Sequence, residues 1–182
     1  MTDPASDPVN PPILARLAAL PSVGGLSVPW ITPQTTDGRY LFGALHPLRH
    51  RAALTRRLCQ ICGQALLHRS VLFMRLSDLP SRCTSEPCCH PECGAYVRAA
   101  CPMVAGRMTH HRHTPLRLDD TMTNSADTPH RLGKPAQPWF VIWLADYRVV
   151  TDPRTGGLAA SYAHTTPLRI RPVNGWLTLL GM

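Results

Sequence analysis

Two pairs of potential metal ligands stand near the middle of the chain. The first pair lies in CQICG (residues 59–63) and the second in HPEC (residues 90–93). Two cysteines separated by two residues form a tight turn whose backbone amides point at the sulfurs, and the glycine that follows tolerates a positive φ. Three thiolates and one imidazole are a donor set typical of structural Zn²⁺. The spacing therefore predicts a zinc site made of Cys59, Cys62, His90 and Cys93.

The second pair is expected at the start of a helix. Pro91 follows His90 directly, and proline is favoured at the first position of a helix. Cys93 then falls in the first turn, where the positive end of the helix dipole favours a thiolate. Four protein ligands leave no open position for water, so the predicted zinc is structural. A redox dithiol at Cys59 and Cys62 is the alternative, but no βαβ pattern surrounds these residues.

Other cysteines near the second pair are rival ligands. Cys83, Cys88 and Cys89 lie close to His90 in the sequence, and Cys89 is the nearest rival. Cys101 is expected as a core thiol on a helical face. The spacing alone leaves open whether Cys89 or Cys101 replaces one of the four predicted ligands.

Short elements are expected to position these ligands. A helix with proline at its first position is predicted over residues 47–58, with an apolar stripe of Leu48, Ala52 and Leu58. A hairpin over residues 66–76 and a helix over residues 90–100 would then follow the zinc turn, which is the order of a treble clef.

The rest of the chain gives weaker signals. The sequence predicts a short helix over residues 13–20, two strands joined by a turn at Asp37-Gly38, and C-terminal strands. The C-terminal strands are expected over residues 139–150, 158–162 and 168–173. The predicted fold class is therefore α+β, with a small zinc-stapled treble-clef-like unit, flanking short strands and a C-terminal antiparallel β part.

Composition suggests where the chain divides. Residues 1–12 are proline-rich and polar and are expected to form a disordered tail. We predict a zinc-binding α+β region over residues 13–106, a polar loop or linker over residues 107–137, and a β region over residues 138–182 that packs on the first.

The charge of the chain favours an anionic partner. The formal net charge is +8, and all but one of the 19 basic residues are arginine. Residues 39–77 contain seven arginines and no acidic residue, directly beside the zinc turn. Trp30, Tyr40 and Phe42 are available to stack on bases. The first choices for phosphate contacts are Arg49, Arg56 and Arg57.

Several classes of protein are not indicated. The sequence has no phosphate-cradling loop, no dinucleotide-binding glycine pattern and no Gly-x-Ser-x-Gly motif. The first twelve residues lack the basic start and apolar run of a secretory signal, and the longest apolar run, residues 139–145, is too short to cross a bilayer. A cytoplasmic location with reduced thiols is therefore expected.

The chain also resembles a family of uncharacterised bacterial and phage-associated proteins that is abundant in actinobacteria. Some members carry the label cell envelope biogenesis protein OmpA, which the missing export signal does not support. The resemblance implies that His90 and Cys93, rather than Cys88 and Cys89, are ligands, but it implies no activity. The matching motifs are VPWI (28–31), DGRYLFG (37–43), CQICG (59–63), FMRLSDLP (73–80), HPECGAY (90–96), ACPMV (100–104), PWFVIWL (138–144), LAASY (158–162) and PLRIRPV (167–173).

Three functions are consistent with these observations. The first is a zinc-stabilised binding module that contacts nucleic acid or a nucleic-acid-associated protein. The second is a non-catalytic protein–protein adaptor that uses residues 139–144. The third is an enzyme, nuclease-like or acting on a small molecule, with a site formed in the loop by His110, His111, Asp119 and Asp120. The sequence does not indicate an oligomeric state.

Overall fold

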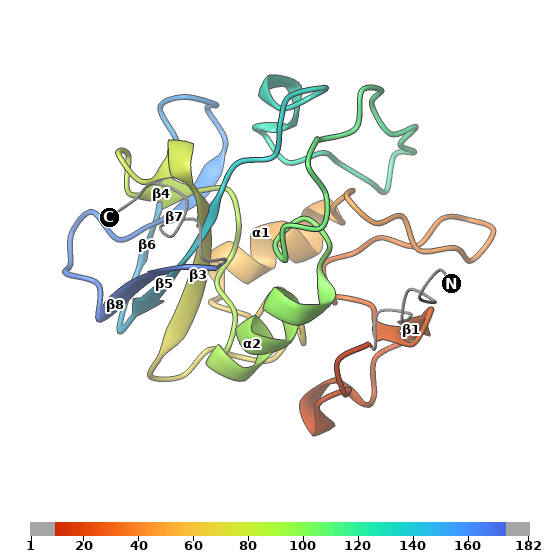
Figure 1. Ribbon diagram of the computed structural model, residues 1–182, viewed down its shortest axis with the longest axis horizontal. Helices are drawn as coiled ribbons and strands as arrows, with labels where there is room; N and C mark the ends of the chain where they lie inside the picture. Colours follow the sequence, from red (N-terminus) through yellow and green to blue (C-terminus); the bar gives the residue numbers. More distant parts are fainter. Residues whose placement is uncertain (1–9, 174–182) are drawn as a thin grey trace, which may run out of the picture.

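The computed structural model describes residues 10–173, and Figure 1 shows strands β3 to β8 gathered on one side of the molecule. Its helices are α1 (Pro47–Thr55) and α2 (Pro91–Ala100), and its single turns of 3-10 helix are η1 (Ala15–Leu17), η2 (Leu76–Asp78) and η3 (Thr128–His130). Its strands are β1 (Ser22–Val23), β2 (Leu26–Ser27), β3 (Ser70–Arg75), β4 (Cys83–Thr84), β5 (Trp139–Leu144), β6 (Arg148–Thr151), β7 (Leu158–Ser161) and β8 (Arg169–Pro172). The predicted α+β class is confirmed.

The main sheet joins one strand from the middle of the chain to two from its C-terminal part. β5 is the central strand and pairs antiparallel with β3 on one side and β8 on the other. Every residue of β3 is buried. A strand covered on both faces reads as a continuous apolar run rather than an alternation, which explains the sequence SVLFM.

Helix α2 packs directly on β3 because of a glycine. A Cβ atom added at Gly94 would lie 2.5 Å from Cγ2 of Val71 and 3.7 Å from Cε2 of Phe73. Only a residue without a side chain allows the helix to approach the sheet this closely. Gly94 therefore sets the distance between α2 and the strand that follows the metal-binding turn.

A second sheet supports α1. β7 is its central strand, pairs antiparallel with β4 and β6, and packs against α1. The buried residues of α1 are Ala53 and Leu54. The predicted apolar stripe is therefore wrong, and Leu48 is 72% exposed.

The end of α1 is a Schellman motif built without glycine. Arg57 has a left-handed φ of 55°, and the amide of Leu58 donates to the carbonyl of Ala53 at 3.1 Å. This ends the helix before the predicted residue 58. The strain at Arg57 is offset by its side chain, which pairs with Asp146 at 2.7 Å and stacks on the ring of Tyr147 at 4.5 Å.

Three other local predictions are corrected. The predicted helix over residues 13–20 is only the single turn η1. The predicted strands over residues 26–32 and 39–43 do not pair with each other: residues 26–27 form β2, which pairs with β1, and Tyr40 forms a bridge with Gln34, outside the first predicted strand. The hairpin over residues 66–76 does not form, because β3 pairs with β5 instead. Of the predicted tail at residues 1–12, only residues 10–12 are described.

The polar segment 107–137 has little regular structure, but salt bridges attach it to the core. Arg75 is only 2% exposed, forms ion pairs with Asp78, Glu86 and Asp127, and lies over the ring of Trp139 at 4.9 Å. Asp127 also accepts from Arg131 at 2.7 Å. These ion pairs therefore fix the middle of the segment against β3. No helix among residues 10–173 has the length and apolar character needed to cross a membrane.

Candidate metal centre

The four predicted ligands form one buried cluster. The ligand atoms of Cys59, Cys62, His90 and Cys93 all lie within 4.8 Å of one another. Cys59 and Cys93 are fully buried, and His90 and Cys62 are 6% and 9% exposed. Among residues 10–173, this is the one group of three or more cysteine, histidine or acidic side chains placed to hold a metal ion. A buried S₃N donor set fits a tetrahedral, closed metal site.

The hydrogen bonds of His90 orient its ring for metal binding. Nε2 lies 3.0 Å from the carbonyl oxygen of Ala65, and because a carbonyl only accepts, Nε2 carries the proton. Nδ1 is then unprotonated, and it lies 3.4 Å from Sγ of Cys62. A ring nitrogen that donates to a carbonyl fixes the tautomer in which the other nitrogen can ligate a metal.

The first ligand pair lies on a turn that is held from both sides. Within the turn, the amide of Gly63 donates to the carbonyl of Cys59 at 2.8 Å. The amide of Trp30 donates to the carbonyl of Ile61 at 2.8 Å, and the amide of Gln60 donates to the carbonyl of Cys88 at 3.2 Å. These bonds satisfy backbone groups that burial of the turn would otherwise leave unpaired.

Gly63 meets two separate constraints at the end of this turn. Its φ is +75°, a conformation that strains residues with a side chain. A Cβ atom added there would also lie 2.8 Å from Cγ of Trp30, so the indole ring packs flat against the glycine. The motif 28–31 therefore covers the metal-binding turn.

Helix α2 presents the second pair as predicted. Pro91 occupies its first position, His90 is the N-cap, and the amide of Gly94 donates to the carbonyl of His90 at 2.8 Å. Cys93 falls in the first turn, facing the cluster. The local sequence thus places one ligand on each side of the start of the helix.

The environment of the thiols favours a bound cation. A hydrogen bond from Cys93 lowers the pKa of Cys59 to about 5, against the effect of burial and with help from the backbone amides of Cys62, His90 and Ile61. The same hydrogen bond, together with burial, raises the pKa of Cys93. Three buried thiolates repel one another, so without a cation they cannot all ionise together. A divalent metal ion removes this repulsion.

Arg16 is an outer contact of the site that the sequence did not reveal. From η1 it forms a 2.9 Å ion pair with Glu92, in the first turn of α2, and donates to the side chain of Gln64 at 2.6 Å. Its guanidinium also interacts with the sulfur of Cys62. An S₃N site holding Zn²⁺ carries a net negative charge, which a neighbouring guanidinium stabilises.

The rival cysteines lie outside the cluster. Cys88 and Cys89 are fully buried, and burial raises the pKa of Cys88 to about 12 and that of Cys89 well above its ordinary value. The amide of Cys89 instead pairs with the carbonyl of Val71 at 2.9 Å. Cys101 follows the end of α2, and burial raises its pKa also. These thiols therefore stay protonated and act as packing groups.

The arginines predicted to contact an anion differ in their surroundings. Arg56 is exposed, whereas Arg49 is partly buried and donates to the carbonyl of Trp30 at 2.8 Å. Arg57 is engaged with Asp146 and Tyr147, and Arg75 is buried in its ion pairs. The stretch 39–77 is therefore not one continuous free basic face.

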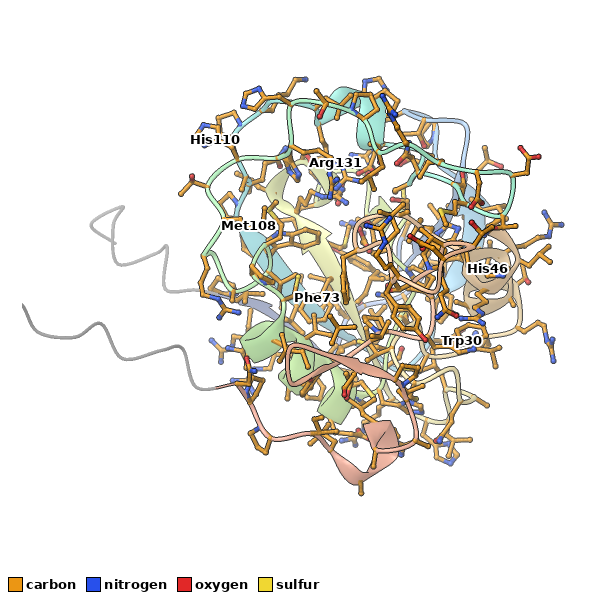
Figure 2. The ribbon with its side chains drawn as sticks, turned by 90° about the vertical axis from the view of Figure 1, so that its right-hand side faces the viewer. Trp30, His46, Phe73, Met108, His110 and Arg131 are labelled. Carbon is orange, nitrogen blue, oxygen red and sulfur yellow. The ribbon has the colours of Figure 1, made fainter. Side chains whose placement is uncertain are left out.

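The polar loop does not gather its ionisable groups into a metal site. His110, Asp119 and Asp120 are exposed, and Figure 2 shows His110 on the outer rim of the segment. His111 is half-buried, and burial together with Arg131 and Arg75 lowers its pKa. None of the four belongs to a metal-binding group in the part of the chain that the structure describes.

Comparison of this chain with protein-family models, curated proteins and solved structures finds no match.

Proposed function

We propose that this protein is a binding module held together by one structural zinc ion, and that it contacts nucleic acid through the exposed basic face of α1. The carrying observation is the buried cluster of Cys59, Cys62, His90 and Cys93, whose first two members follow α1 closely in the chain. The zinc is held by these four residues and supplies folding free energy, on the order of 10 kcal/mol in small zinc domains. The order of metal-binding turn, strand and helix supports a treble-clef-like unit, although the local hairpin of that motif is replaced by the pairing of β3 with β5.

The basic face of α1 supports the nucleic-acid part of the proposal. Arg49 and Arg56 are seven residues apart and therefore share one side of the helix. No carboxylate of residues 10–173 lies within ion-pair distance of Arg49, Arg51 or Arg56. Guanidinium groups without a carboxylate partner on a rigid helix suit phosphate groups, whose neutralisation releases counterions.

The adaptor alternative loses one of its two predicted modes of contact. It expected residues 139–144 to pair with or pack against a partner, and pairing is closed because β5 is the central strand of its sheet and is hydrogen-bonded on both sides. A partner strand therefore cannot add to β5.

Binding of labelled single- and double-stranded oligonucleotides, followed by fluorescence anisotropy at increasing salt, tests the proposal. Arg56→Ala is the informative variant, because Arg57→Ala would also remove the ion pair with Asp146. We expect the affinity to fall about threefold to tenfold, with a shallower salt dependence. Arg39→Ala is the matched control, since Arg39 is exposed but already paired with Asp37 at 2.7 Å. Absence of binding at low salt would rule out the nucleic-acid proposal and leave the zinc site untouched.

A further inference from the structure

A groove of about 320 Å³ lies between α2 and the main sheet. Its helical wall consists of residues spaced three or four apart, which share one face of α2: Pro91, Gly94, Ala95 and Arg98. Gly94 brings α2 into contact with β3, so the groove opens over the other two strands of the sheet.

The register of the sheet brings an indole and two arginines to one face. Trp143 of β5 lies opposite Arg169 of β8, and Val141 lies opposite Arg171. Residues directly opposite each other in an antiparallel pair, and residues two apart along a strand, point to the same face. Trp143, Arg169 and Arg171 all line the groove.

The charges around the groove are unbalanced. Arg98, Arg169 and Arg171 line it, and no acidic residue does. Arg98 donates to the carbonyl of Val173 at 3.3 Å, whereas no side-chain hydrogen bond or ion pair to any residue from 10 to 173 holds Arg169 or Arg171. Three guanidinium groups around one concave surface repel one another, and the low-dielectric walls focus their field. An anion in the groove removes this repulsion.

We propose that the groove binds a nucleotide unit, with its phosphate held by Arg98, Arg169 and Arg171 and its base packed against Trp143. Arginine presents a planar fork that matches phosphate oxygens, and an indole is a platform for any base. A free nucleotide and a nucleotide within a strand offer the same chemistry. The inference uses residues of α2, β5 and β8 and does not rest on the basic face of α1.

Isothermal titration of the full-length, zinc-loaded protein with adenosine 5′-monophosphate, adenosine and inorganic phosphate tests the inference. We expect the monophosphate to bind at least about tenfold more tightly than either fragment, because only it reaches both the arginines and the indole. Binding of a labelled pentanucleotide shows whether the natural ligand is a free nucleotide or a nucleotide within a strand. Binding about tenfold tighter than that of the mononucleotide identifies a strand as the ligand, and equal binding identifies a free nucleotide.

Variants distinguish binding in this groove from nonspecific electrostatic attraction between an anion and a basic protein. Arg169→Ala and Arg171→Ala should each weaken binding of the monophosphate about tenfold, and Arg171→Lys should give a smaller loss. Arg148→Ala removes the same charge from an exposed position on β6 and should leave binding unchanged. Arg56→Ala should also leave binding of the mononucleotide unchanged, whatever it does to longer strands.

Two results would overturn the inference. One is equal loss of affinity in Arg148→Ala and Arg169→Ala, which would mean that only net charge matters. The other is no measurable binding of the monophosphate at low salt by wild-type protein. Thermal melting of each variant checks that a loss of binding is not a loss of fold, and both arginine side chains of β8 are exposed, so their removal should leave the fold intact.

Discussion

At the scale of single residues, the metal cluster depends on groups that hold the ligands as well as on the ligands themselves. The carbonyl oxygen of Ala65 fixes the tautomer of His90 by accepting a 3.0 Å hydrogen bond from Nε2. Arg16 covers Cys62, the most exposed of the four ligands. Outer contacts of this kind orient metal ligands and tune their basicity.

Removal of Arg16 should loosen the metal. We expect Arg16→Ala to release zinc to a chromogenic chelator about tenfold faster than wild-type protein, because the Cys62 thiolate loses a positive neighbour and becomes more accessible. The Arg39→Ala variant removes the same charge from a side chain that pairs with Asp37 and not with a residue of the metal site, and it should release zinc at the wild-type rate. Identical rates in all three proteins would show that Arg16 has no part in retaining the metal.

The ligands could be predicted from the sequence, whereas Arg16 could not. Each ligand pair is a local motif, in which spacing and the neighbouring glycine or proline encode the turn and the helix start. Arg16 reaches Glu92 and Gln64 only because η1 packs against the finished site. Contacts between segments so distant in sequence leave no local signal.

At the scale of elements, the close contact between the metal-binding turn and residues 28–31 sets how tightly the turn is held. Gly63 has a positive φ, and the indole ring of Trp30 occupies the space that a side chain at this position would need. Gly156 has a similar φ of +71° but nothing within 4 Å of an added Cβ atom. The two glycines therefore separate the cost of backbone strain from the cost of a clash.

Alanine at these two positions should have unequal effects. We expect Gly156→Ala to cost about 1 kcal/mol of unfolding free energy from strain alone. Gly63→Ala should cost about 1–3 kcal/mol more, because the methyl group must displace Trp30. Chemical denaturation at saturating zinc measures both. Equal losses would mean that the indole moves aside without cost.

The helices were more predictable than the strands for a related reason. Proline at the first position indicates the starts of α1 and α2 locally, and both helices begin where expected. The pairing of β3 with β5 joins residues about seventy positions apart, so the sequence around β3 suggested a local hairpin instead. The end of α1 was missed because Arg57, and not a glycine, takes the left-handed conformation there. The ion pair that offsets its backbone strain is with Asp146, which is far away in the sequence.

At the scale of the whole molecule, ion pairs with at least one buried partner connect parts of the chain that the sequence suggested were separate. Arg75 of β3 pairs with Asp127 of the polar segment, and Arg154, beyond β6, pairs with Asp78 at 3.1 Å. A buried ion pair stabilises a fold little or no more than well-packed apolar groups of the same volume would. Removal of one partner is nevertheless costly, because it leaves an unpaired buried charge. The proposed boundary at residues 107–137 stays a prediction.

The loss of stability on acidification should depend in part on Asp127. Burial favours the protonated form, but the ion pairs with Arg75 and Arg131 outweigh it and hold the pKa of Asp127 below its ordinary value of 3.8. Its contribution is therefore fully present above pH 3.8 and is lost as the pH falls through the lowered pKa of the folded state. We expect Asp127→Asn to cost about 3 kcal/mol near neutral pH, and progressively less below pH 4.

Denaturation of both proteins at a series of pH values measures this difference, and any loss of metal at low pH affects the two alike. Asp120→Asn is the control, since Asp120 is exposed and has no ion pair with any residue of the range 10–173. It should match wild-type protein at every pH. A cost for Asp127→Asn that does not change with pH would contradict the ion-pair explanation.

The metal content and coordination of the purified full-length protein test the central claim most directly. Elemental analysis combined with X-ray absorption at the zinc edge should find one zinc per chain, bound by three sulfurs and one nitrogen, as the cluster of Cys59, Cys62, His90 and Cys93 requires. A well-folded protein purified without chelators that contains no metal, or one whose metal is bound mainly by oxygen, would contradict it.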